Sequence, residues 1–323
     1  MSKNAENNFI IFLFSIIPIS IIVGQAVSLI NILLISIFLF IQIFRAKDFE
    51  FRNSVPIILL LIIYIYLIFN TFISIDYTLS FFRNFGFLRF IFFFIAINFL
   101  FSNYKNQNLI FKIWSIVILI VIFDSYLEYF LGKNILGYGQ DIYKDRIVSF
   151  FKDEPIVAAY LNGFFFLIIG FLFNLNKANS KIFIISFVLI ILFLTCIIIT
   201  GERSNTIKAL FALFIFFLLN NKFNIKLRLL TFLSLIILFF FMISNSNYLK
   251  YRYLDNMINP VFNSDEREKL LSENIYIKHY KSGYAVFKNN PIFGVGNKNY
   301  RLETRNKINK EKKYLPDTHP HQI

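Results

Sequence analysis

The chain has three histidines, and two of them, His319 and His321, stand in its last seven residues, DTHPHQI. An imidazole titrates near neutral pH, so it is suited to take a proton from a hydroxyl group. A His-x-His pair can also bind a metal ion, but no cluster of carboxylates or cysteines accompanies this one in the sequence. We therefore interpret the segment as a candidate for proton transfer and predict no metal site.

Arg203 lies in TGERSNTIKALFALF (200–214), where an apolar run begins after a short polar turn. Gly201 permits a sharp turn between two antiparallel helices, and Ser204 or Asn205 can cap the second helix. A guanidinium held beside the free backbone N–H groups of a helix N-terminus makes a good anion site. The segment therefore predicts an anion-binding helix start, and the simpler alternative is a charged pair that only marks a hairpin.

Three more arginines lie close to apolar runs. Arg146 opens RIVSFFKDEPIVAAYL (146–161), in which we expect Pro155 in the first turn of a helix. An ordinary acidic helix start explains the carboxylates of this segment, but it does not explain Arg146. Arg83 and Arg89 fall in or at the end of another apolar run.

Long apolar segments must position these side chains. The 323-residue chain is 57% hydrophobic and has a mean hydropathy of +0.62. A helix that crosses a bilayer needs about 20 apolar residues, so we predict an all-α polytopic membrane protein. We place nine spans at about 8–24, 27–44, 55–73, 81–101, 109–130, 155–175, 181–200, 204–220 and 226–245. This division predicts a transmembrane domain, 1–245, and a large, partly helical loop outside the cytoplasm, 246–323.

The distribution of positive charge predicts the orientation. The net charge of +14 is dispersed over loops and span ends, so it indicates topology and not nucleic-acid binding. With the N-terminus in the cytoplasm, every cytoplasmic loop carries at least two basic residues, and the outer loops after the first and third spans carry none. The segment 246–323 then lies in the periplasm of a Gram-negative cell. The single cysteine, Cys196, lies in an apolar run and predicts neither an intramolecular disulfide nor a metal site.

Some basic residues contradict this charge rule, because the topology places them on the outer side. They are Arg83, Arg89, Lys133, Lys144, Arg146, Lys152, Arg203 and Lys208. One interpretation is that they reach lipid phosphates or pair with nearby acidic residues. The acidic residues available are Asp124, Glu128, Asp153, Glu154 and Glu202. We favour an outward-facing site for a phosphate or diphosphate, because charge at membrane depth is costly and by default marks a functional site.

The polar segment contains two further features. In YAVFKNNPIFGVGNKNYR (284–301) we expect a helix to stop at 289–291 and a tight turn to follow at Gly294 and Gly296. Because no strand precedes it, this G-x-G does not indicate a dinucleotide fold. The stretch 264–288 has a helical, amphipathic pattern, and we expect it to lie on or near the bilayer surface.

Taken in order, these segments resemble the O-antigen ligase and polymerase superfamily of bacterial membrane glycosyltransferases. The resemblance rests on RIVSFFKDEPIVAAYL before a span, TGERSN at a span start, the NNPIFGVG turn, and the HPHQ motif. A large outer loop after the last span agrees with it. The resemblance covers the chain from about Arg83 onward. It implies a GT-C-like ligase architecture in the bacterial inner membrane, with the active site facing the periplasm.

The resemblance also implies an activity. Similar proteins take a glycan from a polyprenyl-diphosphate-linked donor and transfer it to an acceptor hydroxyl, on lipid A–core or on another glycan, in lipopolysaccharide or surface-polysaccharide biosynthesis. The implied transfer is inverting, independent of metal and without a cofactor, and membrane lipids surround it. By motif, Arg203 would hold the diphosphate, His321 would deprotonate the acceptor hydroxyl, and His319 would assist. The supporting arginines would be Arg146, Arg83 and Arg89.

Two features depart from the family pattern. Tyr276 and Tyr280 stand where members commonly carry an arginine and a tryptophan, which leaves a sugar or phosphate contact from that helix in question. Members also continue past the histidine motif with further spans, so we expect this chain to be a truncated product.

The motifs leave several functions open. They do not separate a ligase from a polymerase or from a protein-glycosylating relative, and an inactive fragment is a further possibility. Outside this class, the alternative is a transporter of lipid-linked glycans or polysaccharide that performs no catalysis. Transporters often contain inverted repeats and broken helices, and the sequence shows neither pattern.

Overall fold

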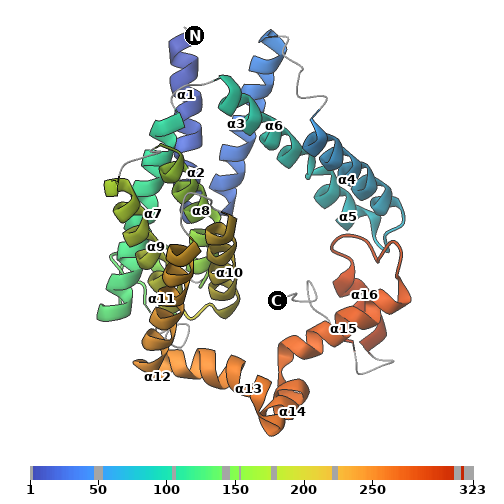
Figure 1. The fold of residues 1–323 in the computed structure, drawn as a ribbon. Helices are drawn as coiled ribbons and strands as arrows, with labels where there is room; N and C mark the ends of the chain where they lie inside the picture. Colours follow the sequence, from blue (N-terminus) through green and yellow to red (C-terminus); the bar gives the residue numbers. More distant parts are fainter. Residues whose placement is uncertain are drawn as a thin grey trace. The chain divides into compact units, whose positions relative to one another are not determined.

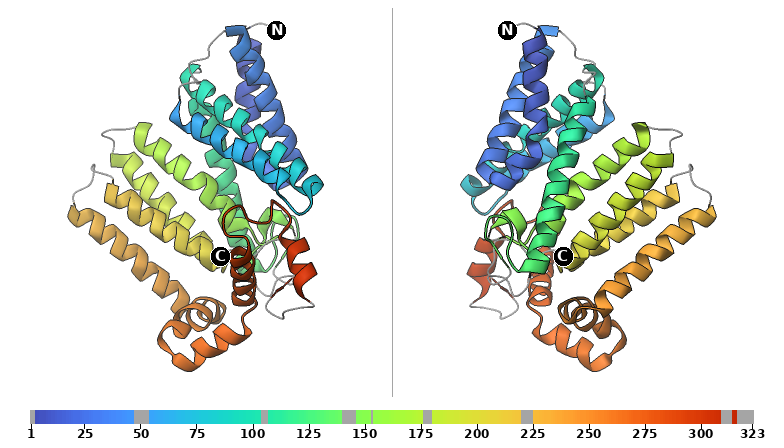
Figure 2. Two further views of the ribbon diagram at one scale, coloured as in Figure 1. Left: turned by 90° about the vertical axis from the view of Figure 1, so that its right-hand side faces the viewer. Right: turned by 90° about the vertical axis from the view of Figure 1, so that its left-hand side faces the viewer.

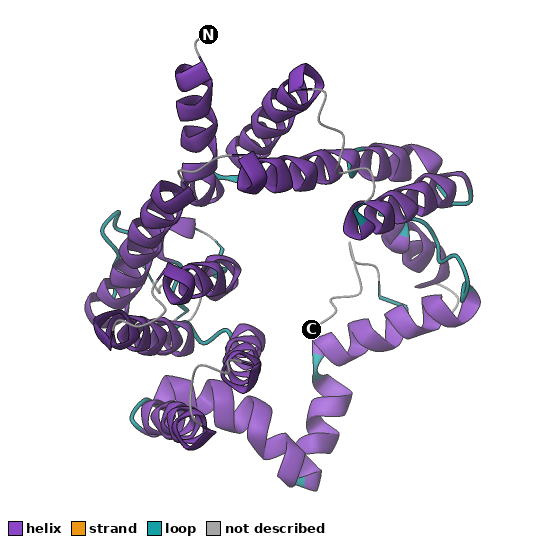
Figure 3. Ribbon diagram, turned by 45° about the horizontal axis from the view of Figure 1, so that its top comes forward, coloured by secondary structure: helices purple, strands orange, loops and turns teal. Residues whose placement is uncertain are grey.

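The structure is a computed structural model that describes residues 3–46, 54–103, 107–139, 146–152, 154–175, 180–219, 225–308 and 314–315. Its regular structure over these residues is helical, without a strand (Figure 1, Figure 3). One isolated antiparallel bridge joins Lys133 and Gly139. The prediction of an all-α protein is therefore confirmed for the described part of the chain.

The helices divide into an apolar series and a shorter polar series. The apolar helices are α1 (Lys3–Ser15), α2 (Ile17–Val23), α3 (Gln25–Ala46), α4 (Val55–Phe72), α5 (Tyr77–Phe85), α6 (Leu88–Asn103), α7 (Gln107–Leu131), α8 (Val157–Leu175), α9 (Ser180–Ile199), α10 (Arg203–Leu219) and α11 (Ile225–Ser244). A 3₁₀ turn, η3 (Ser149–Phe151), precedes α8. The polar helices are α12 (Asn247–Leu249), the π-helical segment η4 (Lys250–Ile258), α13 (Asn259–Phe262), α14 (Ser264–Glu273), α15 (Ile275–Asn289) and α16 (Tyr300–Ile308).

Each predicted span coincides with one helix or with two consecutive helices. Among the described residues, four segments are long and apolar enough to cross a membrane: Gln25–Arg45, Val55–Phe72, Tyr77–Phe101 and Gln107–Leu131. A fifth span results if Leu229–Ser244 and Asn247–Phe262, which are bent by 107°, are counted together. These helices indicate a membrane protein, and the count of nine spans stays a prediction.

Two of the predicted helical segments are broken in the structure. The first predicted span is interrupted at Ile16, between α1 and α2, because Pro18 in the first turn of α2 has no N–H to continue the hydrogen-bond ladder. The stretch 264–288 is helical as predicted, but it is divided at Asn274 into α14 and α15. The Asn274 side chain accepts the N–H of Tyr276 at 2.9 Å and so starts a second helix. The predicted stop at Asn289 is confirmed.

The chain forms two compact units. Unit 1 comprises Met1–Leu13, Leu29–Lys105 and Asn263–Ile323, and unit 2 comprises Phe14–Ser28 and Asn106–Phe262. Each unit contains long apolar helices.

Unit 2 is built from α7 and a row of helices, α8 to α11, in which neighbours in sequence lie side by side (Figure 2). Short connections make the helices of this row antiparallel. The row is packed on apolar side chains such as Leu161 and Phe193, which are fully buried. Because the direction alternates, the start of α8, the α9–α10 turn and the end of α11 meet at one end of the row. We call this region, residues 146–158, 200–206 and 252–256, the polar end of unit 2.

In unit 1, the loop between α15 and α16, residues 290–299, is bound to the α4–α5 connection by asparagine side chains. The buried side chain of Asn299 accepts the N–H of Asp76 at 2.8 Å and donates to Ser80 Oγ at 2.7 Å. Asn297 donates to Asn84 Oδ1 at 2.9 Å, and Ser80 Oγ donates to the Asn297 carbonyl at 2.8 Å. These bonds replace water on buried polar groups, so the loop and the α4–α5 connection stabilise each other.

The loop itself is the tight turn predicted from the sequence. Gly294 has φ +69° and Gly296 has φ +90°, a region that glycine occupies without strain. Any side chain at position 296 would overlap Ser74. Glycine is therefore required there both by conformation and by space.

Asp76 also caps α5 through its carboxylate. Hydrogen bonds from the Thr78 hydroxyl and from the Leu79 N–H hold the pKa of this carboxyl below its usual value. A lowered pKa stabilises the fold at neutral pH, and this contribution is lost as the pH falls through the lowered pKa.

Replacing Asn299 by alanine is expected to lower the free energy of unfolding by about 1–3 kcal/mol, because the Asp76 N–H and the Ser80 hydroxyl lose a buried partner. Thermal unfolding of the detergent-solubilised protein checks this. Asn306→Ala, at an exposed position on α16, is the matched control and should change little. If both variants unfold like wild type, the hydrogen bonds of Asn299 to Asp76 and Ser80 do not stabilise the protein.

Candidate functional site

The α9–α10 turn at the polar end of unit 2 depends on Gly201. Its φ is +69°, as the predicted sharp turn requires, and any side chain at this position would overlap the Tyr248 hydroxyl. The Arg252 guanidinium donates to the Gly201 carbonyl oxygen through Nη2 at 3.0 Å and Nε at 3.3 Å. The turn is thus held from outside by η4.

The start of α10 differs from the sequence prediction. The helix begins at Arg203, so Ser204 and Asn205 lie in its first turn and the prediction that one of them caps it is wrong. The Glu202 carbonyl accepts the N–H of Thr206 at 3.0 Å, which makes Glu202 the residue at which the helix starts. Arg203 is consequently the first helical residue, beside the N–H groups that have no partner within the helix.

Glu202 is the buried centre of the polar end, with 6% of its surface exposed. Its Oε1 accepts the N–H of Ala158 at 2.9 Å, and its Oε2 accepts the side-chain N–H of Asn205 at 2.6 Å. Burial raises the pKa of the Glu202 carboxyl, whereas these hydrogen bonds and the nearby Arg146 guanidinium act to lower it. One carboxylate therefore connects the start of α8, the start of α10 and the Arg146 segment.

Arg203 is held against the π-helical segment η4. Its Nη1 donates to the Asn256 carbonyl oxygen at 2.8 Å. The fully buried Tyr253 lies on the same segment, and its hydroxyl is 2.7 Å from the Thr206 hydroxyl and 3.2 Å from the Ile198 carbonyl oxygen. These contacts fix the direction of the guanidinium. π-Helical turns are rare and are frequently found at functional sites.

Arg146 is half-buried and precedes a loop that buried carboxylates hold in place. Its Nε is buried and has no hydrogen-bond partner among the described residues. Glu128, near the end of α7, accepts the N–H of Val148 at 3.0 Å and that of Ser149 at 2.6 Å. Asp124 accepts the Ser149 hydroxyl at 2.5 Å. The sequence analysis considered Asp124 and Glu128 as partners of basic residues. In the structure they instead accept hydrogen bonds from Val148 and Ser149 and so position the loop that follows Arg146.

The prediction for Pro155 is wrong by two residues. Helix α8 begins at Val157, and the Ile156 carbonyl accepts the N–H of Tyr160 at 3.0 Å. Pro155 therefore lies before the helix, in the non-helical segment that leads into it.

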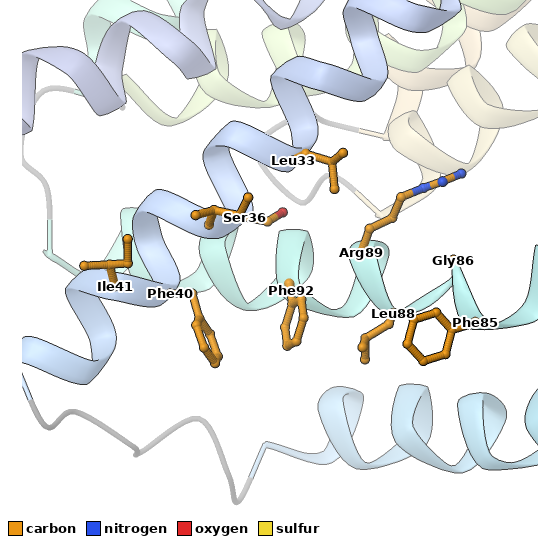
Figure 4. A pocket seen from close by; sticks show the side chains of 10 residues that line it. Leu33, Ser36, Phe40, Ile41, Phe85, Gly86, Leu88, Arg89 and Phe92 are labelled. Atoms are coloured by element: carbon orange, nitrogen blue, oxygen red, sulfur yellow. The ribbon is translucent and has the colours of Figure 1, made fainter. Parts of the chain in front are cut away.

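Arg83 and Arg89 lie in unit 1. Arg83 is exposed in the last turn of α5. Arg89 is half-buried in the first turn of α6, with its guanidinium carbon 4.8 Å from the centre of the Phe90 ring. It stands at one end of an apolar groove of about 380 Å³ between α3 and the α5–α6 region (Figure 4). The groove is lined by Leu33, Ser36, Ile37, Phe40, Ile41, Phe85, Gly86, Leu88, Arg89 and Phe92.

The two candidate histidines, His319 and His321, lie outside the described residues. The last described residues before them are anchored to α15. Tyr314 is 1% exposed and accepts a hydrogen bond from Asn289 Nδ2 at 2.8 Å. The N–H of Leu315 donates to the Ser282 hydroxyl oxygen at 3.0 Å. Tyr314 and Leu315 are therefore fixed on α15.

Comparison with known proteins adds one decisive observation. Residues 187–323 match the sequence profile of a family described as O-antigen ligase. The match covers less than half of the chain, and we call residues 187–323 the O-antigen ligase domain after the family to which they are similar. No curated protein and no solved structure matches the chain.

The O-antigen ligase domain starts within α9 and contains Arg203, Glu202 and the histidine motif. Arg146, Arg83 and Arg89 lie before it. The match indicates a ligase-like role in surface-polysaccharide biosynthesis and a glycosyl-transfer reaction in general. It also confirms the resemblance that was based on the TGERSN, NNPIFGVG and HPHQ motifs.

The sequence analysis missed three residues at the polar end of unit 2 that lie in the O-antigen ligase domain. Arg252, Tyr253 and Asn256 were treated as an undivided polar segment. The signal that could have found them is YRYLDN (251–256), where polar and aromatic residues directly follow the last apolar run.

Replacing Gly201 by alanine is expected to lower the free energy of unfolding by about 1–3 kcal/mol, because alanine is strained at positive φ and its methyl group would displace Tyr248. Gly163→Ala is the control, since this glycine lies inside α8 with open space around it and should gain helix propensity. Thermal unfolding of both variants in detergent measures the difference. Equal unfolding temperatures would contradict the described turn.

Proposed function

We propose that this chain transfers a glycan from a polyprenyl-diphosphate-linked donor to an acceptor hydroxyl, on lipid A–core or another glycan, at the periplasmic face of the inner membrane. The observation that carries the proposal is that Arg203 directly follows the buried Glu202, whose carboxylate accepts the Ala158 N–H and lies near the Arg146 guanidinium. The O-antigen ligase domain supports the glycosyl-transfer chemistry.

The arginines are proposed to bind the leaving group. When the bond between the anomeric carbon and the diphosphate oxygen breaks, negative charge develops on the diphosphate. A guanidinium that is fixed at a helix N-terminus stabilises this charge without reorganisation, because its direction is set before the reaction. The contact between Arg203 and Asn256 provides this fixation. We propose that Arg146 gives a second contact, and that Arg83 and Arg89 are supporting candidates. In this proposal the arginines take the place of a metal ion.

His321 is proposed as the general base, and His319 as its assistant. The acceptor oxygen attacks the anomeric carbon from the face opposite the diphosphate, and the electron pair of the breaking bond passes to the leaving diphosphate. The acceptor proton passes to the His321 imidazole. A single displacement of this kind inverts the configuration at the anomeric carbon.

The proposed orientation rests on the basic residues of the predicted cytoplasmic loops. If the N-terminus is cytoplasmic, the polar end of unit 2 faces the periplasm, and the segment 246–323 forms a polar domain on that side. The proposed architecture is GT-C-like, with nine spans.

The proposal is tested in a strain from which the gene is deleted. Lipid-linked glycan should accumulate on the outer leaflet, and the wild-type gene, but not one encoding Arg203→Ala and Arg146→Ala, should clear it. Restoration by the double variant would remove the basis of the proposal. Accumulation on the cytoplasmic leaflet would instead favour a transporter.

A further inference from the structure

Unit 2 contains a second feature that the proposed reaction does not use, a pocket of about 370 Å³ next to the Arg146 segment. One wall is the break between α2 and α3, and the other is the segment that leads from η3 to α8. The lining residues that carry the argument below are Gln25, Ser28, Phe150, Lys152, Glu154 and Ile156. Its volume is at the lower end of the range for small-molecule sites, about 300–1,000 Å³.

The two walls are joined by Tyr160 on α8. Its hydroxyl donates to the Pro18 carbonyl of α2 at 3.2 Å, and its ring lies 5.1 Å from the ring of Phe151. On the η3 side, Glu128 accepts the N–H groups of Val148 and Ser149. The pocket is therefore formed before any ligand enters, which lowers the entropy lost on binding.

The polar groups of the pocket suit hydroxyl groups. Gln25 offers an amide, Ser28 a hydroxyl, Lys152 an ammonium and Glu154 a carboxylate. None of these four side chains makes a hydrogen bond or ion pair with another described residue. Donors and acceptors stand beside the half-buried ring of Phe150, a combination that fits a sugar, whose hydroxyls form hydrogen bonds and whose C–H face packs on an aromatic ring.

The backbone around the pocket is unusual as well. Lys152 has φ +52° without being a glycine, and Gly24 has φ +143° at the break between α2 and α3. Residues held in such conformations cluster at ligand sites, where the surrounding structure imposes them. Here the anchored Ser149 and the contact of the Glu154 N–H with the Phe151 carbonyl, at 3.0 Å, bracket Lys152.

The pocket adjoins the polar end of unit 2. Ile156 lines the pocket, and two residues later the Ala158 N–H binds Glu202. Arg146 lies at the other end of the same segment. A ligand that places a phosphate at the arginines can therefore extend its next group along 146–158 toward the pocket.

We propose that this pocket binds a sugar unit of the glycan that undergoes transfer. The proposal rests on the proposed function for its source of ligand, and it assigns Gln25, Ser28, Lys152 and Glu154 as groups that bind the sugar hydroxyls. The sugar comes either from the diphosphate-linked donor or from the acceptor glycan, and the experiment below separates the two sources.

The test measures binding of free oligosaccharide to the purified full chain in detergent, by saturation-transfer NMR and titration. One probe is the oligosaccharide released from the lipid-linked donor by mild acid, and the other is the core oligosaccharide released from lipid A. We expect one of them to bind, and we expect Gln25→Ala/Glu154→Gln to weaken it at least about tenfold, since two hydrogen bonds are lost. Glu268→Gln, at an exposed position on α14, is the charge-matched control and should bind like wild type.

A second variant separates a failure of the sugar pocket from a failure of the proposed diphosphate site. Arg203→Ala should weaken binding of the intact diphosphate-linked donor and leave binding of the free oligosaccharide within about twofold. If Arg203→Ala leaves donor binding unchanged while the double variant loses the sugar, the pocket stands and the proposed diphosphate site fails. If neither oligosaccharide binds wild type, or if the double variant binds as wild type does, the sugar pocket is overturned.

Discussion

Alanine at position 203 should lower glycan transfer by about 10²–10³-fold, the loss found when one fixed donor to a developing negative charge is removed. Arg203 is the first residue of α10, and its guanidinium is directed by the Asn256 carbonyl at 2.8 Å. The loss should appear in kcat and in kcat/KM alike if the contact strengthens as the diphosphate leaves. The measurement is the rate of product formation by purified protein with lipid-linked donor.

Two controls separate this chemical effect from a structural one. Lys208→Ala removes a positive charge from an exposed position on the same helix and should retain activity. Arg203→Lys keeps the charge but loses the planar fork of donors, so an intermediate rate is expected. Wild-type rates for Arg203→Ala, with unchanged unfolding temperature, would contradict the assignment of the leaving-group site.

His321→Ala should lower transfer by about 10²–10⁴-fold, the usual contribution of a general base. The wild-type rate should rise with pH through the histidine pKa, near 6.5 for an unperturbed imidazole, because only the neutral ring accepts a proton. The variant should lose this dependence. Rates measured from pH 5 to pH 8 test both statements.

The third histidine offers a matched control for this prediction. His279→Ala changes an imidazole on α15, which is not part of the HPHQ motif, and should keep the pH profile of wild type. His319→Ala should cause a smaller loss than His321→Ala, since it is assigned an assisting role. A His321→Ala protein that keeps the rise of activity with pH would exclude His321 as the base.

The parts of the fold that follow from local rules were predictable. Apolar block length located the apolar helices, because a bilayer demands long apolar segments and leaves backbone groups no other partner. Gly201 predicted the α9–α10 turn, and Asn289 before Asn290 and Pro291 predicted the end of α15. In each case, the residue itself restricts the backbone.

The helix starts were less predictable. Ser204 and Asn205 are favourable caps in isolation, but the Glu202 carboxylate is occupied by Ala158, 44 positions away, and this contact sets where α10 begins. Pro155 is favourable in a first turn, yet α8 starts two residues later. Local propensity is a weak prior, which tertiary contacts override.

Contacts between distant segments could not be read from the sequence. Asn299 binds Asp76 across 223 positions, and neither residue lies in a motif that indicates the other. Asp124 and Glu128 looked like partners for basic side chains. Instead, Glu128 accepts backbone N–H groups and Asp124 accepts the Ser149 hydroxyl of a loop whose path depends on the fold. The candidate site was therefore predictable in its arginines and not in the groups that position them.

The most direct measurement combines purified protein, lipid-linked donor and acceptor, with a chelator present, and analyses both products. The proposed function predicts one free polyprenyl diphosphate for each glycan transferred, and an anomeric configuration in the product opposite to that in the donor. Retention of configuration, loss of activity on adding the chelator, or disappearance of donor without a new glycosidic bond would contradict it.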